Sequence, residues 1–170
     1  VGTNAVIEGD DADAALVTTK GAEDTITLMR GSKGLTDGLS VEEYLNSHEL
    51  ARPEPLVPKG DVFGMDERID CKGETVVEFN EETAREIATE IDRAGRDAVA
   101  VSFLWSFLND DHEERMAEIL HEELDDDVFV TTSSSLSPIS GEYERTAAVA
   151  INAITGPATS EYIAEIDDGL

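Results

Sequence analysis

The sequence predicts an α/β fold with a mixed, largely parallel sheet and flanking helices. Strand-like and helix-like patterns alternate three times between residues 74 and 170, which is typical of parallel strands joined by crossover helices. The stretch Ala98–Trp105 is almost continuously apolar, as expected for a strand that is covered on both faces. At 170 residues, the chain is long enough for one domain with a substantial core.

Residues 1–73 are less regular than the rest. Ala14–Thr19 predicts a short buried strand, and Ala22–Arg30 predicts a helix. Ser40 followed by Glu43 is typical of a capping box, in which each side chain binds the backbone amide of the other residue. The three prolines of residues 52–58 predict an extended segment, because proline lacks an amide donor and restricts its neighbours.

The patterns after residue 61 are clearer. Val62–Asp70 and Glu74–Phe79 predict the two strands of a hairpin. Asn80 predicts the N-cap of a helix that ends at Gly95. The apolar positions of this helix recur at the spacing of one buried face: Ala84, Ile87, Ala88 and Ile91.

Three more helices and one strand complete the prediction. Asn109 predicts the N-cap of a helix, and Val128–Thr131 predicts the next strand. A long helix follows Gly141, and its inward-facing residues are expected to be Ala147, Ala150, Ile151 and Ile154. Gly156-Pro157 predicts the end of that helix and the start of a separate one over Thr159–Ile166.

The chain is strongly acidic, with 12 basic against 39 acidic side chains and a net charge of −27. This balance excludes a nucleic-acid or anionic-membrane partner, because Lys and Arg bind both. No apolar run approaches the roughly 20 residues that span a bilayer. Cys71 is the single cysteine, so an internal disulfide is excluded and we expect a reducing, cytoplasmic location.

So acidic a surface predicts a protein from a salt-loving organism whose folding requires salt. In dilute buffer the carboxylates repel one another, whereas at ~1 M salt the Debye length falls to about 3 Å and screens most of that repulsion. We expect the native circular dichroism spectrum to appear only as potassium chloride is added. A full native spectrum in salt-free buffer would contradict this prediction.

The densest group of polar side chains follows the turn at Pro138–Gly141. Arg145 suits bidentate binding of a phosphate or carboxylate, and Glu144 is expected to hold it. The alternative is ordinary acids at a helix N-terminus beside a surface arginine. Adjacent residues point to different sides of a helix, so one or two of them can share a pocket.

Two other polar clusters have structural explanations. Asp110–Glu114 resembles a metal cluster, but the first turn of a helix favours acids without any metal, and we predict no metal site. Thr131–Ser135 follows a predicted strand, where its hydroxyls either form a polar loop or meet a ligand at the edge of an open sheet.

Several segments together resemble the hydantoinase/oxoprolinase family, in the family's order and over nearly the whole chain. They are Thr3–Glu8, Ala15–Gly21, Arg52–Pro58, Glu67–Asp70, Ala98–Asn109 and Glu142–Thr146. The resemblance implies part of an actin-like ATPase fold, shared with sugar kinases and heat-shock ATPases. It also implies an enzyme that uses ATP and Mg²⁺ to activate a cyclic amide, such as hydantoin or 5-oxoproline, for hydrolysis.

The same resemblance implies that the family's phosphate-binding hairpin lies upstream of Val1 and that the second half of the fold follows Leu170. Residues 1–170 are therefore expected to be one domain excised from a longer enzyme, without activity, ATP or Mg²⁺ of its own. Thr3 and Asn4 are expected to lie near substrate or phosphate. Glu144 and Arg145 are expected to be catalytic, and Arg52 and Glu54 to be structural.

Two alternatives stay open. One is a subunit of an ATP-dependent ketone carboxylase, since the family includes such enzymes. The other is a non-catalytic α/β module that binds a small molecule or a partner, such as the B-type subunit with which the family's A-type proteins pair.

Overall fold

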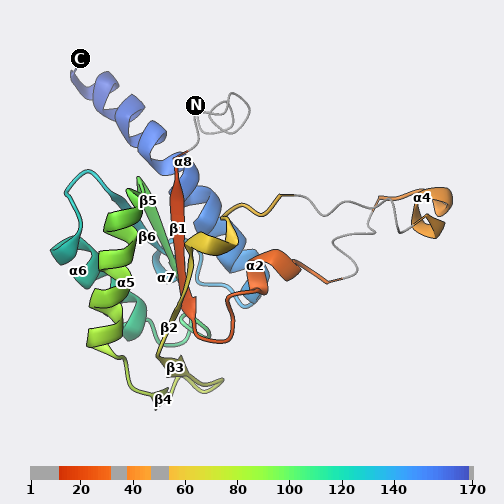
Figure 1. The fold of residues 1–170 in the computed structure, drawn as a ribbon, viewed down its shortest axis with the longest axis horizontal. Helices are drawn as coiled ribbons and strands as arrows, with labels where there is room; N and C mark the ends of the chain where they lie inside the picture. Colours follow the sequence, from red (N-terminus) through yellow and green to blue (C-terminus); the bar gives the residue numbers. More distant parts are fainter. Residues whose placement is uncertain (1–11, 32–37, 47–53, 169–170) are drawn as a thin grey trace.

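The computed structural model of the chain describes residues 12–31, 38–46 and 54–168 (Figure 1). Its centre is a four-stranded sheet in the order β2-β1-β5-β6. The strands are β1 (Ala14–Thr19), β2 (Val62–Met65), β5 (Ala98–Ser102) and β6 (Phe129–Thr132). All four run parallel, so the predicted α/β fold with a largely parallel sheet is confirmed.

Helices cover both faces of this sheet (Figure 1). One face packs against α5 (Glu81–Ala94) and α6 (Asp111–Glu123), and the other packs against α2 (Thr25–Leu28) and α8 (Glu142–Asp168). The remaining short helices are α4 (Val41–Leu45), η2 (Lys59–Asp61) and α7 (Ser133–Leu136). None of the helices in the described ranges has both the length and the apolar character to span a bilayer.

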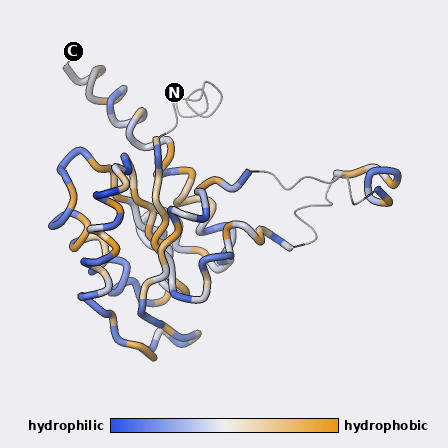
Figure 2. Tube along the Cα trace, in the orientation of Figure 1, coloured by the Kyte–Doolittle hydropathy of each residue, from blue (hydrophilic) through white to orange (hydrophobic). Residues whose placement is uncertain are grey.

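The two central strands are buried on both faces, and Figure 2 shows their apolar residues at the centre of the fold. Because side chains alternate along a strand, Val17 and Val101 join the core under α5 and α6. Leu16 and Ala100 join the core under α8. The near-continuous apolar pattern of these strands therefore reflects burial on two sides.

The predicted capping box at Ser40 and the predicted caps of α5 are confirmed. The Ser40 hydroxyl accepts from the Glu43 amide, while the Glu43 carboxylate accepts from the Ser40 amide at 2.8 Å. Asn80 accepts from the Thr83 amide at 3.1 Å and caps α5, and Gly95 ends it in the left-handed region. The predicted stripe of α5 is buried.

Several predicted boundaries are wrong. The segment Val62–Asp70 is not one hairpin strand: Val62–Met65 joins the main sheet, and only β3 (Arg68–Ile69) pairs with β4 (Thr75–Val77). The Ala22–Arg30 helix shrinks to α2. Asp110, not Asn109, precedes α6, although the Asn109 side chain still accepts from the Asp111 amide at 3.1 Å.

The last helix differs most from the prediction, because α8 continues through Gly156 and Pro157. Gly156 lets the helix lie close to β6, since a Cβ added there would meet the Phe129 ring at 2.3 Å. Three residues before Pro157, the Ile154 carbonyl accepts from the Ala12 amide at 3.1 Å, so the chain entering β1 binds a helix carbonyl near the proline. Ile151, predicted to face inward, is exposed, and Val149 and Ala153 are buried in addition to Ala150 and Ile154.

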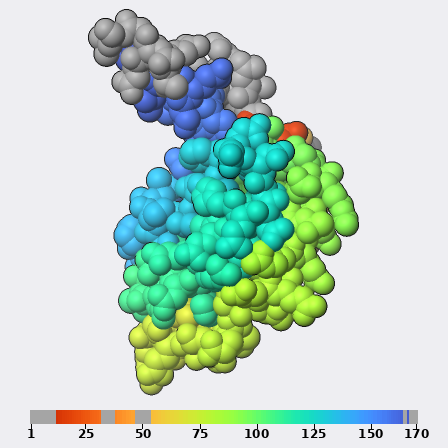
Figure 3. Space-filling model, turned by 90° about the vertical axis from the view of Figure 1, so that its left-hand side faces the viewer, coloured from red at the N-terminus to blue at the C-terminus, as the bar shows by residue number. Residues whose placement is uncertain are grey.

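α5 and α6 lie side by side on the face shown in Figure 3, and ion pairs on this face share few cations among many acids. Arg85 binds both Glu122 and Glu123, and Arg115 binds Glu81 and Glu118 at 3.0 and 2.8 Å. These exposed pairs contribute little each, so they do not remove the predicted need for salt.

Candidate functional site at the carboxyl edge of the sheet

The carboxyl ends of the four parallel strands meet at one edge of the sheet, where polar side chains replace the apolar core. The Thr18 hydroxyl of β1 donates to the Ser102 carbonyl of β5 at 2.8 Å. The Ser102 hydroxyl lies 2.9 Å from the Thr146 hydroxyl of α8. All three side chains are buried, so this edge is an ordered polar layer.

Among the described residues, Arg145 is the largest fully buried side chain and is only 2% exposed. Its Nη2 donates to the Phe103 carbonyl at 2.7 Å, and its Nη1 donates to the Ile139 carbonyl at 3.2 Å. Its Nε donates to the Ser133 hydroxyl at 3.1 Å, and the guanidinium lies 5.3 Å from the centre of the Phe107 ring. Burial lowers the pKa of Arg145, and the nearby Glu113 and Glu142 carboxylates oppose that shift.

Glu113 is the buried counter-charge to this arginine. Its Oε1 accepts from the Phe103 amide at 2.7 Å and from the Ser133 hydroxyl at 2.6 Å, and its Oε2 accepts from the Ser134 amide at 2.8 Å. Phe103 is therefore held at its amide by Glu113 and at its carbonyl by Arg145. These two hydrogen bonds fix the loop that follows β5.

A second buried network lies beside the first. His112 Nδ1 is 2.8 Å from the Glu67 carboxylate, which also accepts from the Thr19 hydroxyl. The Leu104 amide donates to that same hydroxyl at 2.9 Å. Adjacent residues of α6, His112 and Glu113, thus bind loops that follow different strands.

The sequence did not lead us to predict that His112 and Glu113 are buried. The cluster Asp110–Glu114 contained the signal, but we attributed its acids to the helix dipole, which explains only the exposed members. Among the described residues, no group of three or more His, Cys, Asp or Glu side chains is placed to hold a metal ion.

Next to the Arg145 network lies a cavity of about 360 Å³. Its lining comes from β3, the loop after β5 and the start of α8: Arg68, Leu104, Trp105, Phe107, Ser140, Gly141, Glu142 and Arg145. Trp105 has a φ of 63°, which is strained for a residue with a bulky side chain. Such outliers gather where surrounding structure holds them for a function.

The β3–β4 hairpin carries Arg68 to this cavity. Ile69 anchors the hairpin in the core, and the Asn109 side chain donates to the Gly73 carbonyl at 3.1 Å. At the turn, Asp70 Oδ1 accepts from the Lys72 amide at 2.8 Å and from the Glu74 amide at 3.0 Å. These amides lower the pKa of Asp70, with the Lys72 amide contributing most.

We expect Asp70→Ala to remove the protection of the Lys72 and Glu74 amides against hydrogen exchange at neutral pH. Because the pKa of Asp70 is lower in the folded protein, its contribution is present above the ordinary aspartate pKa and is lost as the pH falls through the folded value. Protection factors measured by NMR against pH should fall in acid for the wild type only. Glu78→Ala, at an exposed acid beyond β4, is the control and should change neither amide.

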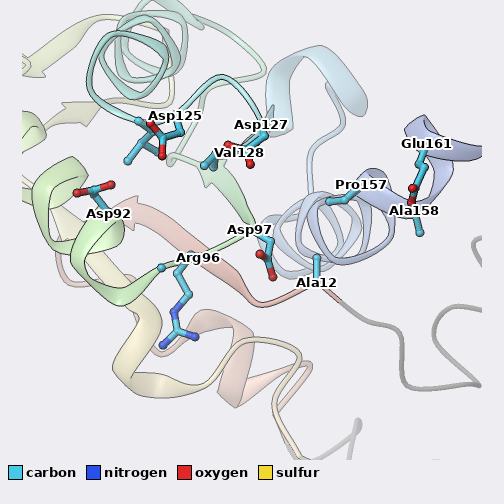
Figure 4. A pocket seen from close by; sticks show the side chains of 12 residues that line it. Ala12, Asp92, Arg96, Asp97, Asp125, Asp127, Val128, Pro157, Ala158 and Glu161 are labelled. Atoms are coloured by element: carbon cyan, nitrogen blue, oxygen red, sulfur yellow. The ribbon is translucent and has the colours of Figure 1, made fainter. Parts of the chain in front are cut away.

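The opposite edge of the sheet has a larger cavity of about 720 Å³ (Figure 4). Five carboxylates and one guanidinium line it, from Asp92, Arg96, Asp97, Asp125, Asp127 and Glu161. Arg96 is already paired there, 2.8 Å from Asp61. The two cavities therefore differ sharply in charge.

Comparison with known proteins now decides the family. The family described as "Hydantoinase/oxoprolinase N-terminal region" matches residues 1–124. The chain belongs to the hydantoinase/oxoprolinase family. The resemblance inferred from the sequence segments is thus confirmed.

Members of the hydantoinase/oxoprolinase family align along nearly the whole chain. The acetophenone carboxylase gamma subunit of Aromatoleum aromaticum is 37% identical over 90% of this chain and 21% of its own. The caprolactamase subunit alpha of Pseudomonas jessenii is 30% identical over 98% of this chain and 23% of its own. The chain therefore spans about a fifth of the length of these relatives.

Solved structures confirm the fold. The crystal structure of the ATP-dependent caprolactamase from Pseudomonas jessenii matches with a TM-score of 0.85 and 29% identity, covering 98% of this chain and 23% of that one. A nucleotide-free acetone carboxylase matches with a TM-score of 0.88 and 24% identity, covering 99% of this chain and 24% of that one.

In this hydantoinase/oxoprolinase chain, the predicted site residues Arg145 and Glu144 have different partners. Arg145 lines the cavity, but Glu144 does not hold it: Glu144 lies 2.9 Å from Arg30 Nε. Its own backbone amide and then Arg30 lower the pKa of Glu144, whose carboxylate lies against Gly141. Glu54 is exposed. The other predicted site residues, Thr3, Asn4 and Arg52, lie outside the described residues.

Proposed function

We propose that this chain is the N-terminal region of an ATP-dependent enzyme that activates the ring carbonyl of a cyclic amide for hydrolysis. The observation that carries the proposal is the likeness, over 98% of the chain, to an ATP-dependent enzyme named for a cyclic amide, caprolactam. We also propose a cytoplasmic location, where ATP is available.

An amide carbonyl is a poor electrophile, because nitrogen donates electron density to it. Bound ATP would supply the phosphoryl group that turns the carbonyl oxygen into part of a leaving group. The described residues do not offer a cluster that fits Mg²⁺, so we assign neither Mg²⁺ nor a phosphate-transfer step to them. Their proposed contribution is to bind and orient the ring compound at the carboxyl edge of the sheet, where open α/β sheets gather ligands.

Within that edge, we propose different roles for the predicted residues. Arg145 holds the cavity loop through Phe103 and lines the cavity in which we place the ligand. Glu144 stands beside Gly141 at the cavity lining, where it orders the start of α8. Thr3 and Asn4 remain proposed neighbours of substrate or phosphate.

The test is an activity screen of the full-length protein from the parent gene. ADP release is measured with hydantoin, 5-oxoproline and acetophenone, each with and without bicarbonate. A cyclic amide is expected to stimulate ADP release without bicarbonate and to yield the ring-opened acid. The 170-residue chain alone is expected to release no ADP. The proposal would be overturned if none of the cyclic amides stimulated ADP release by the full-length protein.

Ketone carboxylation is the second candidate, because the acetophenone carboxylase gamma subunit is 37% identical. It requires bicarbonate as the source of the new carboxylate, so ADP release that needs both acetophenone and bicarbonate would identify it. Relatives named as subunits also support a partner, such as a B-type subunit, which co-purification of the full-length protein would reveal.

A further inference from the structure

We infer that the 360 Å³ cavity recognises the carboxylate of a small ring compound, and that Arg68 is the residue that binds it. This inference deepens the proposed function and rests on it for the identity of the ring, a cyclic amide. It selects carboxylate-bearing substrates over neutral ones such as hydantoin or acetophenone.

The charge of the cavity is the first observation. In a chain with 12 basic and 39 acidic side chains, this cavity is lined by two guanidinium groups and one carboxylate. The larger cavity, by contrast, is lined by five carboxylates and one guanidinium. Because Glu113 balances the charge of Arg145, Arg68 supplies the positive charge that this lining offers to an anion.

Arg68 is the guanidinium free to bind that anion. Arg145 directs three N–H groups to Phe103, Ser133 and Ile139 and lies against the Phe107 ring. Arg68 is half-buried and makes no ion pair or side-chain hydrogen bond with the other described residues. Its planar group can accept a carboxylate with two parallel hydrogen bonds.

The aromatic wall accounts for the ring of the ligand. The Trp105 and Phe107 rings lie 5.7 Å apart and tilted by 40°, and the partly exposed Trp105, whose backbone is strained, lines the same cavity as Arg68. A volume of about 360 Å³ is at the small end of ligand cavities, which suits a single ring with one substituent.

The experiment uses the single tryptophan of the chain, Trp105, as its reporter. Tryptophan emission of the 170-residue chain is followed during titration with 5-oxoproline and with 2-pyrrolidinone, the same lactam ring without the carboxylate. The titrations are run at the lowest salt at which circular dichroism shows the folded chain, because salt screens the contact. A saturable change with 5-oxoproline is expected, with binding to 2-pyrrolidinone at least about tenfold weaker.

Arg68→Gln is expected to weaken 5-oxoproline binding at least about tenfold and to leave 2-pyrrolidinone binding unchanged. Arg93→Gln, at an exposed arginine near the end of α5, is the matched control and should change neither. Equal affinity for the two ligands, an equal response to inorganic phosphate, or an unchanged affinity in Arg68→Gln would overturn the inference.

Steady-state kinetics of the full-length protein separate this inference from the proposed function. If cyclic amides are hydrolysed, Arg68→Gln should raise KM for 5-oxoproline with little change in kcat. Turnover of both lactams with equal KM would overturn the carboxylate site and leave the proposed function standing. Carboxylate-selective binding without amide turnover would overturn the proposed function and leave the site.

Discussion

Glu113→Ala is expected to lower the free energy of unfolding by about 3–5 kcal/mol, the largest effect of any single polar substitution considered for this chain. The substitution removes three hydrogen bonds and leaves the Phe103 and Ser134 amides without their acceptor. It also leaves Arg145 buried without its counter-charge. Urea unfolding followed by circular dichroism in molar salt measures the loss.

The neighbouring residue supplies the control. Glu114 is in the same turn of α6 but exposed, so Glu114→Ala should stay within about 0.5 kcal/mol of the wild type. Combining Glu113→Ala with Arg145→Met should cost less than the sum of the single changes, because the double variant buries no unpaired charge. Additive losses would show that the two side chains do not form one unit.

Gly156→Ala is expected to destabilise the protein even though alanine favours a helix more than glycine does. The new Cβ would meet the Phe129 ring at 2.3 Å, which forces the ring or α8 to move. Such overpacking costs about 1–3 kcal/mol, which exceeds the gain in helix propensity of about 1 kcal/mol. The midpoint of urea unfolding should therefore fall.

A smaller residue at the contact tests the cause. In the background of Phe129→Leu, Gly156→Ala should become neutral or stabilising, because the ring that it meets is gone. Gly60→Ala is the control, since nothing lies within 4 Å of a Cβ added there. A rise in stability for Gly156→Ala in the wild-type background would mean that α8 and β6 are less tightly packed than the structure shows.

The elements that the sequence predicted well are those with a local cause. Ala14–Thr19 and the stripe of α5 follow from burial patterns within one segment, and Asn80 and Gly95 follow from capping chemistry. The break predicted at Pro157 is wrong because its cause is not local. Gly156 is required by the ring of Phe129, which lies on another element.

Less of the candidate site could be predicted from the sequence, because its contacts join residues that lie far apart in the chain. Arg145 was recognised as important, but its partners are the carbonyl of Phe103, which lies 42 positions away, and the hydroxyl of Ser133. Glu113 is hidden among exposed acids of the same type in the sequence. Arg68 gains its role only when the β3–β4 hairpin folds over the loop after β5.

The adjacent residues His112 and Glu113 restrict how three loops can move. One holds Glu67 after β2, and the other holds Phe103 and Ser134 after β5 and β6. A single turn of α6 thereby clamps three loops, so none of them can shift without tilting the helix. Any rearrangement in this region should therefore move α6 and the three loops together as a rigid body, with little bending of the individual loops.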